Sequence, residues 1–543
     1  MKIAGAWSGH DCSYFIMEDG QPVRHDEYER FIREKEPAGD SLDFLMKNYP
    51  EYQDIQHLVT CSPSSKLTHY QESYNLMLEV IKKNGGNVYV VGHHKAHAAN
   101  TFFSSNLDEA TIITMDGGGV EENNFSTAFT LWLGKENKIE HIHSFPLHQV
   151  NIGGLWTRAT RYIFKLQSGW PRGHQAGSVM AMAALGDPSR FEADFEKMLT
   201  TDIQAASHKP SNQPKGALVP GNDPKHPYLN KWAMIADQSE QDRFDLAAGL
   251  QSASEKVVRN IFSAMFSQIP TKNLCLAGGV TLNSVMMGKI KTWFPDIENI
   301  YITPTPHDGG LPIGATQFVW HHVMDNPRIV WNDNFTPYLG KTHKEDAIRE
   351  IIDSMTEKVT VSNASDSDVV ELLANQNIVS VFGKGSESGR RALGNRSILA
   401  DPRSPDMKNM INEKVKHRQW YRPFAPSILR EEVKNWFKDD VSSPYMSFVV
   451  KFKDEVLEKI PAVLHFDNTA RLQTVTKDDN PWYHNFLQLW NEKTGVPILL
   501  NTSFNDREPI CETPSHAIDC FLRTNIDFLF FRDYQLLVSK IDA

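Results

Sequence analysis

Short apolar runs, rich in β-branched residues and bounded by turn residues, are the feature of this sequence that most constrains its fold. They occur at 1–6, 13–17, 87–91, 111–115, 273–277, 299–303, 377–382 and 497–500. Their length and composition predict β-strands. Helical patterns lie between several of them, most clearly at 244–266, where apolar residues recur at three- and four-residue spacing. The sequence therefore predicts an α/β protein.

The chain of 543 residues is long enough for about two to four domains. Residues 204–227 hold five prolines and little periodicity, which predicts a long surface excursion. Another irregular stretch, 326–345, precedes a helical pattern at 345–357. We therefore place a domain boundary there and expect domains at 1–340 and 341–543.

Charge and apolar content exclude several classes of protein. The 56 Lys and Arg residues against 67 Asp and Glu give a net charge of −11, which argues against general nucleic-acid binding. No apolar run approaches the roughly 20 residues of a membrane helix, and Met1 leads into a strand-like run instead of a leader. The five cysteines are scattered, with no C-x-x-C spacing. We expect a cytoplasmic protein with reduced thiols.

A candidate metal site combines a histidine pair with two aspartates. His93 and His97 are spaced so that both lie on one face of a helix, where two imidazoles can share a metal, although such a pair alone is more often solvated or capping. Asp116 and Asp308 each follow a strand-like run and precede glycines, a position that favours a metal or phosphate site, although one Asp-Gly alone indicates a turn. Together the four residues suit a divalent transition metal, with iron and zinc both open.

Two further segments carry weaker signals. Gly278 and Gly279, within 277–283, lie between a strand and a helix, where glycines leave backbone N–H groups open to a nucleotide phosphate. His10, within 8–13, interrupts two strand-like runs. It belongs either to a hairpin connection or to a catalytic site, as a general base or as a polariser of an acyl group.

The C-terminal part concentrates cations among glycines, aromatics and prolines, at 389–397, at 416–426, at Arg471 and next to 501–505. In an acidic protein, such a concentration is not expected of a merely solvated face. Arginine binds phosphate bidentately and lysine adds a point charge. We interpret these segments as a site for small phosphorylated ligands.

Together these residues resemble the O-carbamoyltransferase family that includes the nodulation-factor, cephalosporin and tobramycin carbamoyltransferases. The match is nearly chain-long, and its motifs occur in the family's order: GHDCS, HHKAHA, MDGGG, AGGVTLN, TPHDGGLPIGA, RALGNRSILADPR, KHRQWYRPFAPSIL, TARLQTV and NTSFN. The resemblance implies that 1–340 form a two-lobed domain of the actin and Hsp70 type, similar to the threonylcarbamoyladenosine transferase. It implies that 341–543 form an α/β domain similar to the threonylcarbamoyl-adenylate synthase.

The resemblance also implies a two-stage reaction. Carbamoyl phosphate and ATP, the latter with Mg²⁺, form carbamoyl-adenylate in the C-terminal domain. A hydroxyl of a small-molecule, sugar or nucleoside acceptor then takes the carbamoyl group in the N-terminal domain, where family members use Fe(II). No membrane is involved, and a homodimer is the default expectation.

Position by position, the resemblance assigns roles to the candidate residues. Lys416, Arg422 and Arg471 would be catalytic in activation, and His10 would face the carbamoyl group. Carbamoyl phosphate or the ATP phosphates would be bound by Lys416, Arg418, Arg422, Arg471, Asn501 and Ser503. The nucleotide would lie against Gly117, Gly118, Gly278, Gly279, Val280 and Asn283. The metal would be held by His93, His97, Asp116 and Asp308.

The chain departs from the family pattern at three places. Residues 176–178 stand where relatives commonly have a Glu and a Lys, which bears on the acceptor. Arg390 replaces a usual proline, and 506–508 lack a glycine normally found before Glu-Pro. The competing interpretations are an actin-fold ATPase or small-molecule kinase without carbamoyl chemistry, and a nucleotide-dependent scaffold protein without activity.

Overall fold

The computed structural model describes residues 1–61, 70–167, 175–200, 226–331 and 337–541. The chain divides into two compact units. Unit 1 comprises Met1–Glu29 and Lys35–Phe335, and unit 2 comprises Arg30–Glu34 and Thr336–Ala543. The sequence analysis placed its boundary after residue 340 and assigned no N-terminal segment to the second domain.

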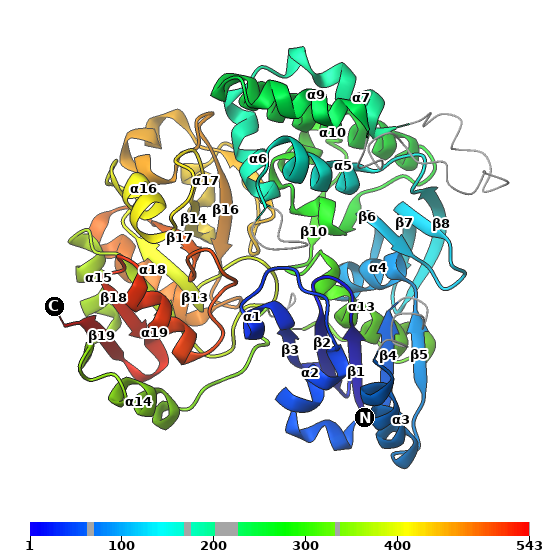
Figure 1. Ribbon diagram of the computed structural model, residues 1–543, viewed down its shortest axis with the longest axis horizontal. Coiled ribbons are helices and arrows are strands. Elements are labelled where there is room, and N and C mark those ends of the chain that lie inside the picture. The colour runs from blue at the N-terminus through cyan, green and yellow to red at the C-terminus, as the bar shows by residue number, and fades with distance from the viewer. Residues whose placement is uncertain (62–69, 168–174, 201–225, 332–336, 542–543) are drawn as a thin grey trace. The chain divides into compact units, whose positions relative to one another are not determined.

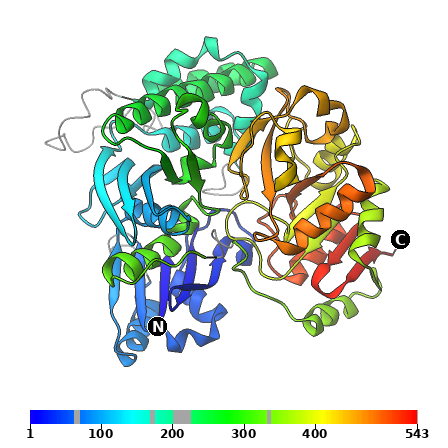
Figure 2. The same ribbon diagram turned by 180° about the vertical axis from the view of Figure 1, so that it is seen from behind.

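Unit 1 contains two five-stranded sheets with the same topology (Figures 1 and 2). In spatial order, the first sheet consists of β3 (Gln21–Glu27), β2 (Ser13–Glu18), β1 (Lys2–Trp7), β4 (His57–Cys61) and β5 (Val88–Val91). The second consists of β8 (Lys138–Pro146), β7 (Ser126–Lys135), β6 (Glu109–Val120), β9 (Asn273–Ala277) and β10 (Asn299–Ile302). In each sheet, three antiparallel strands continue into two parallel ones. This duplication confirms the expected two-lobed fold of the actin and Hsp70 type.

Helices connect and cover these strands, because parallel neighbours require crossover connections. They are α2 (Ser41–Asn48), α3 (Gln71–Lys83), α4 (His93–Phe103), α5 (Ile152–Arg158), α6 (Ala176–Met182), α7 (Glu192–Leu199), α9 (Pro227–Ala236), α10 (Glu240–Phe266), α11 (Ser284–Gly288), α12 (Ile290–Trp293) and α13 (Leu311–Gln317). Helix α13 packs on α4 and on β1, β2 and β4, and so links the two lobes. A side chain at Gly314 would place its Cβ 1.9 Å from the carbonyl oxygen of Ala96, so only glycine allows this approach of α13 to α4.

Unit 2 is an α/β unit built on a nine-stranded mixed sheet, as expected. In spatial order its strands are β11 (Val359–Asn363), β19 (Leu536–Lys540), β18 (Phe528–Phe531), β12 (Val379–Phe382), β13 (Arg396–Ala400), β17 (Ile498–Ser503), β14 (Ala425–Leu429), β16 (Thr469–Val475) and β15 (Phe448–Lys451). Its helices are α14 (Glu345–Asp353), α15 (Asp366–Ala374), α16 (Met407–Met410), α17 (Val433–Trp436), α18 (Pro481–Thr494) and α19 (Pro514–Arg523), while α1 (Tyr28–Ile32) crosses the division between the units. Trp490, Phe486 and Leu487 of α18 are fully buried against the sheet.

Every apolar run singled out in the sequence overlaps a strand and extends at most two residues beyond it, and the pattern at 244–266 lies in α10. Two expectations need correction. The pattern at 345–357 gives a helix that ends at Asp353, and Asp116 does not end its strand, because β6 continues to Val120 through a register irregularity between Met115 and Gly119. Of the excursion predicted at 204–227, 204–225 lie outside the described residues, and Pro227 already begins α9. Among the described residues, no helix combines the length and apolarity that a membrane crossing needs.

Candidate functional site

Helix α4, which carries the histidine pair, is fixed at its N-terminus by two carboxylates. The backbone N–H of Gly92 donates to Glu122 (2.8 Å), and that of His94 donates to Glu121 (2.7 Å). Anionic side chains at this end satisfy donors that have no partner inside the helix and oppose its positive dipole end. His94 is buried and hydrogen-bonds to the Thr114 hydroxyl (2.6 Å) and the Thr127 carbonyl (3.0 Å), which ties the helix to β6 and β7.

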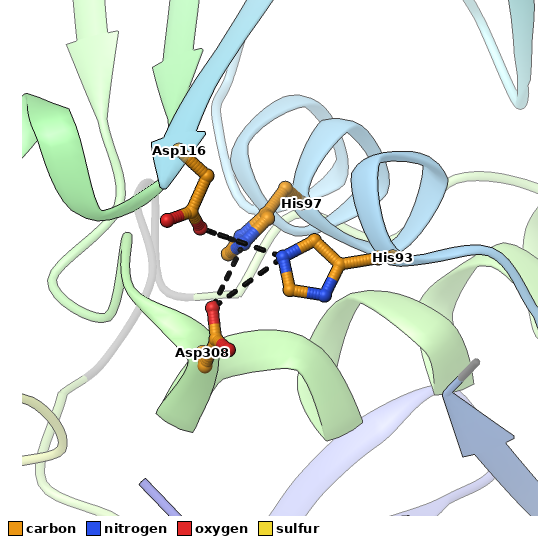
Figure 3. A group of neighbouring side chains, drawn as sticks. All are labelled: His93, His97, Asp116 and Asp308. Carbon is orange, nitrogen blue, oxygen red and sulfur yellow. Dashed lines mark hydrogen bonds and ion pairs between the residues drawn. The ribbon is translucent and has the colours of Figure 1, made fainter. Parts of the chain in front are cut away.

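His93 and His97 meet Asp116 and Asp308 in one compact group (Figure 3). One ligand atom from each residue lies within 4.8 Å of the other three. Nε2 of His97 is 3.0 Å from Asp116 and 3.5 Å from Asp308, and Nε2 of His93 is 3.4 Å and 3.5 Å from the same two carboxylates. The structure thus brings together all four residues of the predicted metal set.

Asp308 is held in place by its neighbour along the chain. It opens the short 3₁₀ turn Asp308–Gly310 that leads into α13. The carbonyl oxygen of Gly309 accepts hydrogen bonds from Ser13 (2.9 Å) and His25 (2.9 Å), which come from β2 and β3. The first lobe therefore positions Asp308, while the second lobe supplies Asp116.

The donor set of this group fits a divalent metal. Burial opposes charge on both partners, yet hydrogen bonds with Asp116 and Asp308 raise the pKa of His97 to about 9, and the two histidines hold the pKa of Asp116 well below its usual range. The cluster is therefore stable as protonated imidazole beside carboxylate, and a divalent cation can replace those protons. Two imidazole nitrogens and two carboxylate oxygens suit iron or zinc.

His10 lies in the connection between β1 and β2, next to the metal-type group. Its Nε2 is 3.2 Å from Asp308, and its Nδ1 is 3.1 Å from Asp11. Although burial lowers it, the pKa of His10 is raised to about 9 by Asp308 and Asp11. At neutral pH the ring is therefore an imidazolium, and its side chain is 47% exposed, so a bound molecule can reach it.

The glycines predicted to face a nucleotide lie beside the same group. Gly278 has φ +94°, and a Cβ there would fall 2.0 Å from the carbonyl oxygen of Met115, so β9 and β6 approach closely only with glycine. A Cβ on Gly279 would lie 3.4 Å from Oδ1 of Asp116. Gly117 and Gly118 follow Asp116 in β6, and Val280 is buried in the turn after Gly278.

Asn283, which was expected to contact the nucleotide, is engaged within the protein. Its side chain caps α11 by accepting from the backbone N–H of Met286 (3.1 Å). It also exchanges two hydrogen bonds with Gln251 of α10 (2.8 and 3.2 Å). In this arrangement it orients the turn that contains the two glycines.

In unit 2, Lys416 is buried at the end of the turn Ile411–Val415. Its ammonium donates to the carbonyl oxygen of Ser503 (2.5 Å) and to both oxygens of Asn505 (2.6 and 2.8 Å), and it lies 3.3 Å from the Ser503 hydroxyl. The lysine therefore holds the loop after β17 in place. This structural role was not expected from the sequence, which predicted only contacts with substrates and a part in catalysis.

Arginines cluster near Lys416, on the part of the sheet formed by β13, β17, β14 and β16. Burial and the neighbouring Arg471, Arg390 and Arg422 hold the pKa of Arg391 well below its usual range. Burial and the nearby Arg422 lower the pKa of Arg471 to about 10. Burial, Arg422 and Arg471 likewise hold the pKa of Arg418 well below its usual range. This group of half-buried guanidiniums is called the arginine cluster below; its members are Arg390, Arg391, Arg418, Arg422 and Arg471.

The members of this cluster differ in how they are held. Arg418 donates to the Asn412 side chain (2.7 Å) and to the Pro423 carbonyl (3.3 Å). Arg422 and Arg471 donate no side-chain hydrogen bond to any described residue and form no ion pair with one. Two guanidiniums without a compensating partner have the charge and the donors to bind an anion.

Asn501 and Ser503 lie on β17 between these cations. The Asn501 amide donates to Ala392, Ser427 and Gln473 (3.2, 3.1 and 2.8 Å), so it fixes the segment after Arg391. The Ser503 hydroxyl donates to Asn505 (2.7 Å).

Sequence reasoning did not single out Glu387, and it included Arg391 only as part of the cationic segment 389–397. Oε1 of the fully buried Glu387 accepts from three backbone N–H groups, those of Leu393 (2.7 Å), Asn395 (2.7 Å) and Arg396 (3.1 Å). This carboxylate holds the turn that follows Arg391. The motif that begins at Arg391 was the available signal for that residue. No sequence pattern indicates the role of Glu387, because its partners are backbone groups.

Both halves of the chain are similar to known proteins. The family model described as Carbamoyltransferase N-terminus matches residues 65–317, and Carbamoyltransferase C-terminus matches residues 370–538. The uncharacterized protein sll1178 of Synechocystis sp. is 34% identical over 82% of this chain and 75% of its own length. Nodulation protein NolO of Bradyrhizobium diazoefficiens is 32% identical (81% and 77%), and the uncharacterized protein MJ1058 of Methanocaldococcus jannaschii is 32% identical (83% and 73%). Both halves of the chain are thus matched, and the chain belongs to the carbamoyltransferase family.

Proposed function

We propose that this transferase makes carbamoyl-adenylate from carbamoyl phosphate and ATP in unit 2 and passes the carbamoyl group to an acceptor hydroxyl in unit 1. The observation that carries the proposal is the arginine cluster, where Arg422 and Arg471 have no anionic partner among the described residues. Two phosphorylated substrates supply the missing negative charge. An ATPase or a kinase of the actin fold has no need of such a cluster.

Activation follows from the charges at this site. Water first hydrolyses carbamoyl phosphate to carbamate and inorganic phosphate. A carbamate oxygen then attacks the α-phosphorus of ATP, the bond from the α-phosphorus to the bridging oxygen breaks, and pyrophosphate leaves; Mg²⁺ would offset part of its charge. Arg422 and Arg471 offset the charge of the phosphates, and Lys416 and Ser503 hold the loop that closes the site. The product is a mixed anhydride, which turns the weakly electrophilic carbamoyl carbon into one with a good leaving group.

Transfer uses the group around Asp116 and Asp308. His93, His97, Asp116 and Asp308 would hold a divalent metal, Fe(II) in our proposal, which as a Lewis acid stabilises charge when the acceptor oxygen attacks. The acceptor oxygen attacks the carbamoyl carbon, the bond to the AMP oxygen breaks, AMP leaves, and the proton of the acceptor hydroxyl passes to solvent. The exposed His10 imidazolium donates to the carbamoyl oxygen, so of the two catalytic roles considered for His10 we favour the polariser. The turn at Gly278 and Gly279 orients the adenylate.

Product analysis tests this proposal. The protein is incubated with ATP, Mg²⁺ and carbamoyl phosphate, and nucleotide products are separated with and without carbamoyl phosphate. We expect pyrophosphate and carbamoyl-adenylate, which yields AMP when it is hydrolysed, to form only when carbamoyl phosphate is present. ADP formation without carbamoyl phosphate would instead establish an ATPase or kinase, and a protein inert toward all three would establish a scaffold role.

The acceptor is sought among hydroxylated small molecules, sugars and nucleosides. A carbamoyl group adds HNCO, so mass spectrometry detects a carbamoylated product as a gain of about 43 Da when the complete reaction of activation and transfer takes place. Omission of carbamoyl phosphate is the control, because the mass gain must disappear with it.

A further inference from the structure

A second group of metal-ligating side chains lies in unit 2. It consists of Glu508, Cys511 and Cys520, which each place one ligand atom within 4.8 Å of the other two. Cys511 lies in the loop after β17, Cys520 lies on α19, and both thiols are fully buried. We propose that these three side chains form a zinc site, which carbamoyl activation and transfer do not use.

The donor types and their spacing fit zinc. Thiolate sulfur binds Zn²⁺ at about 2.3 Å and carboxylate oxygen at about 2.0–2.2 Å. Three such donors around one tetrahedral ion lie roughly 3.5–3.8 Å apart, which small side-chain adjustments reach from the observed spacing. Soft thiolate donors favour zinc over magnesium or calcium. The side chain of Glu508 is 17% exposed, so solvent can fill the fourth position.

The carboxylate of Glu508 has one oxygen that can bind a metal ion. Its described contacts, with Arg523, with Arg33 (3.3 Å) and with the backbone N–H of Asp506 (3.3 Å), all go to Oε1. Oε2 makes no hydrogen bond or ion pair with any residue that the structure describes. Arg33 and Arg523 therefore orient the carboxylate and leave its second oxygen for a ligand.

Charge balance also permits the site. When Zn²⁺ binds two thiols, two protons leave, so the net charge of the group stays the same. The two neighbouring arginines consequently face no added positive charge. The complete ligand set carries one net negative charge around the ion, and Arg33 and Arg523 compensate it.

The position of the site gives it a structural role. A zinc ion would tie the loop at 508–511 to α19, and the same loop carries Asn505, whose side chain accepts from Lys416. The site would thereby help to fix the loop that contains Asn505. The competing interpretation is that the two thiols only pack against each other beside an ordinary ion pair.

Cobalt titration of the full-length protein separates these interpretations. Co²⁺ replaces zinc, and a thiolate ligand gives it an intense near-ultraviolet charge-transfer absorption that histidine and carboxylate ligands lack. The protein is first stripped of metal with a chelator. We expect about two equivalents of bound Co²⁺ in the wild type, with the thiolate band present. Absence of the band in the folded wild type would overturn the proposal, whatever the activity of the enzyme.

Variants assign the band to these residues. In Cys511→Ser and Cys520→Ser, we expect loss of the band and a fall of about one equivalent of metal. Cys275→Ser, which changes a buried thiol on β9, is the matched control and should retain both. His93→Ala should lose the other equivalent and keep the band. A band that persists in the Cys511→Ser, Cys520→Ser double variant would contradict the assignment, and circular dichroism establishes that each variant is folded.

Discussion

The two candidate sites handle charge in opposite ways. Around Asp116 and Asp308, each histidine lies beside a carboxylate, and the two carboxylates raise the pKa of His97 to about 9, so opposite charges meet there even without a ligand. Around Arg471 and Arg418, burial lowers the pKa values, and the neighbouring arginines add to this effect by repulsion. In our proposal, the first site exchanges protons for a metal ion. The second site is destabilised by its own charge until a bound anion offsets it.

The largest effect should come from removing the lysine of the second site. In Lys416→Ala, pyrophosphate release in the presence of ATP and carbamoyl phosphate should fall at least about 1,000-fold, because one charged donor and its hold on the Ser503–Asn505 loop disappear together. Metal binding at the histidine–aspartate site should be unchanged. Lys493→Ala, which alters an exposed lysine of the same unit, is the control. Undiminished pyrophosphate release would place activation elsewhere.

Asp116→Asn breaks the other site. Carbamoyl transfer should fall about 100- to 1,000-fold, because the substitution removes a metal ligand, while pyrophosphate release should remain. Metal analysis of the Asp116→Asn variant should show that the ion is lost. Asp325→Asn, which changes an exposed aspartate of unit 1, is the control and should keep the ion. Retention of the metal by Asp116→Asn would show that the ion is bound by other residues.

The turn behind Arg391 can be tested by Glu387→Ala. The substitution leaves three backbone N–H groups without their acceptor, which should lower the free energy of unfolding by on the order of 3 kcal/mol. Chemical denaturation measures this, and Glu387→Gln should lose less because its side-chain oxygen still accepts. The KM for carbamoyl phosphate should rise in the folded alanine variant. An unchanged KM would mean that the turn does not position the arginines.

His10→Asn separates transfer from activation. The variant loses the imidazolium that lies 3.2 Å from Asp308, so transfer should slow about 10- to 100-fold. Pyrophosphate release should stay measurable, which distinguishes this variant from Lys416→Ala. If both variants lose pyrophosphate release equally, the proposed division of labour between the units is wrong.

The smallest effect is expected from Arg471→Met, for which the direction of the change in stability is the informative result. Arg471→Met removes one cation from a crowded group, so affinity for carbamoyl phosphate should fall about 10-fold while the ligand-free protein becomes more stable by on the order of 1–3 kcal/mol. Arg349→Met, on exposed α14, should change neither quantity. Thermal unfolding without ligands measures the gain, and a loss of stability would show that the cluster is compensated in the free protein. Asp116→Asn should shift stability in the opposite direction, because His97 loses its partner.

Sequence patterns captured the residues that lie next to apolar runs. His93, Asp116 and Asp308 follow strand-like segments and adjoin motifs of glycine or histidine, so their convergence could be expected from an α/β fold. The duplicated sheet order became an expectation only through the family resemblance, since polar strands such as β3 show no strong apolar run and the apolar strand β7 was not recognised.

The supporting contacts could not be predicted in the same way. Glu121 and Glu122 cap α4 across 27 and 30 residues of sequence, and Glu387 binds backbone groups, which leave no side-chain pattern. Segment Arg30–Glu34 contributes Arg33, which donates to the carbonyl oxygen of Ile510 (2.8 Å) although 477 residues separate them. Only tertiary structure can reveal such pairings.

The separation of the two chemistries is tested most directly by metal removal. The wild-type protein is stripped of metal with a chelator, returned to Mg²⁺, and supplied with ATP, carbamoyl phosphate and a competent acceptor, and pyrophosphate and carbamoylated product are both quantified. We expect pyrophosphate release to continue without carbamoylated product, and Fe(II) to restore the product. Loss of pyrophosphate release together with the product would show that activation also depends on the stripped metal and would contradict the account.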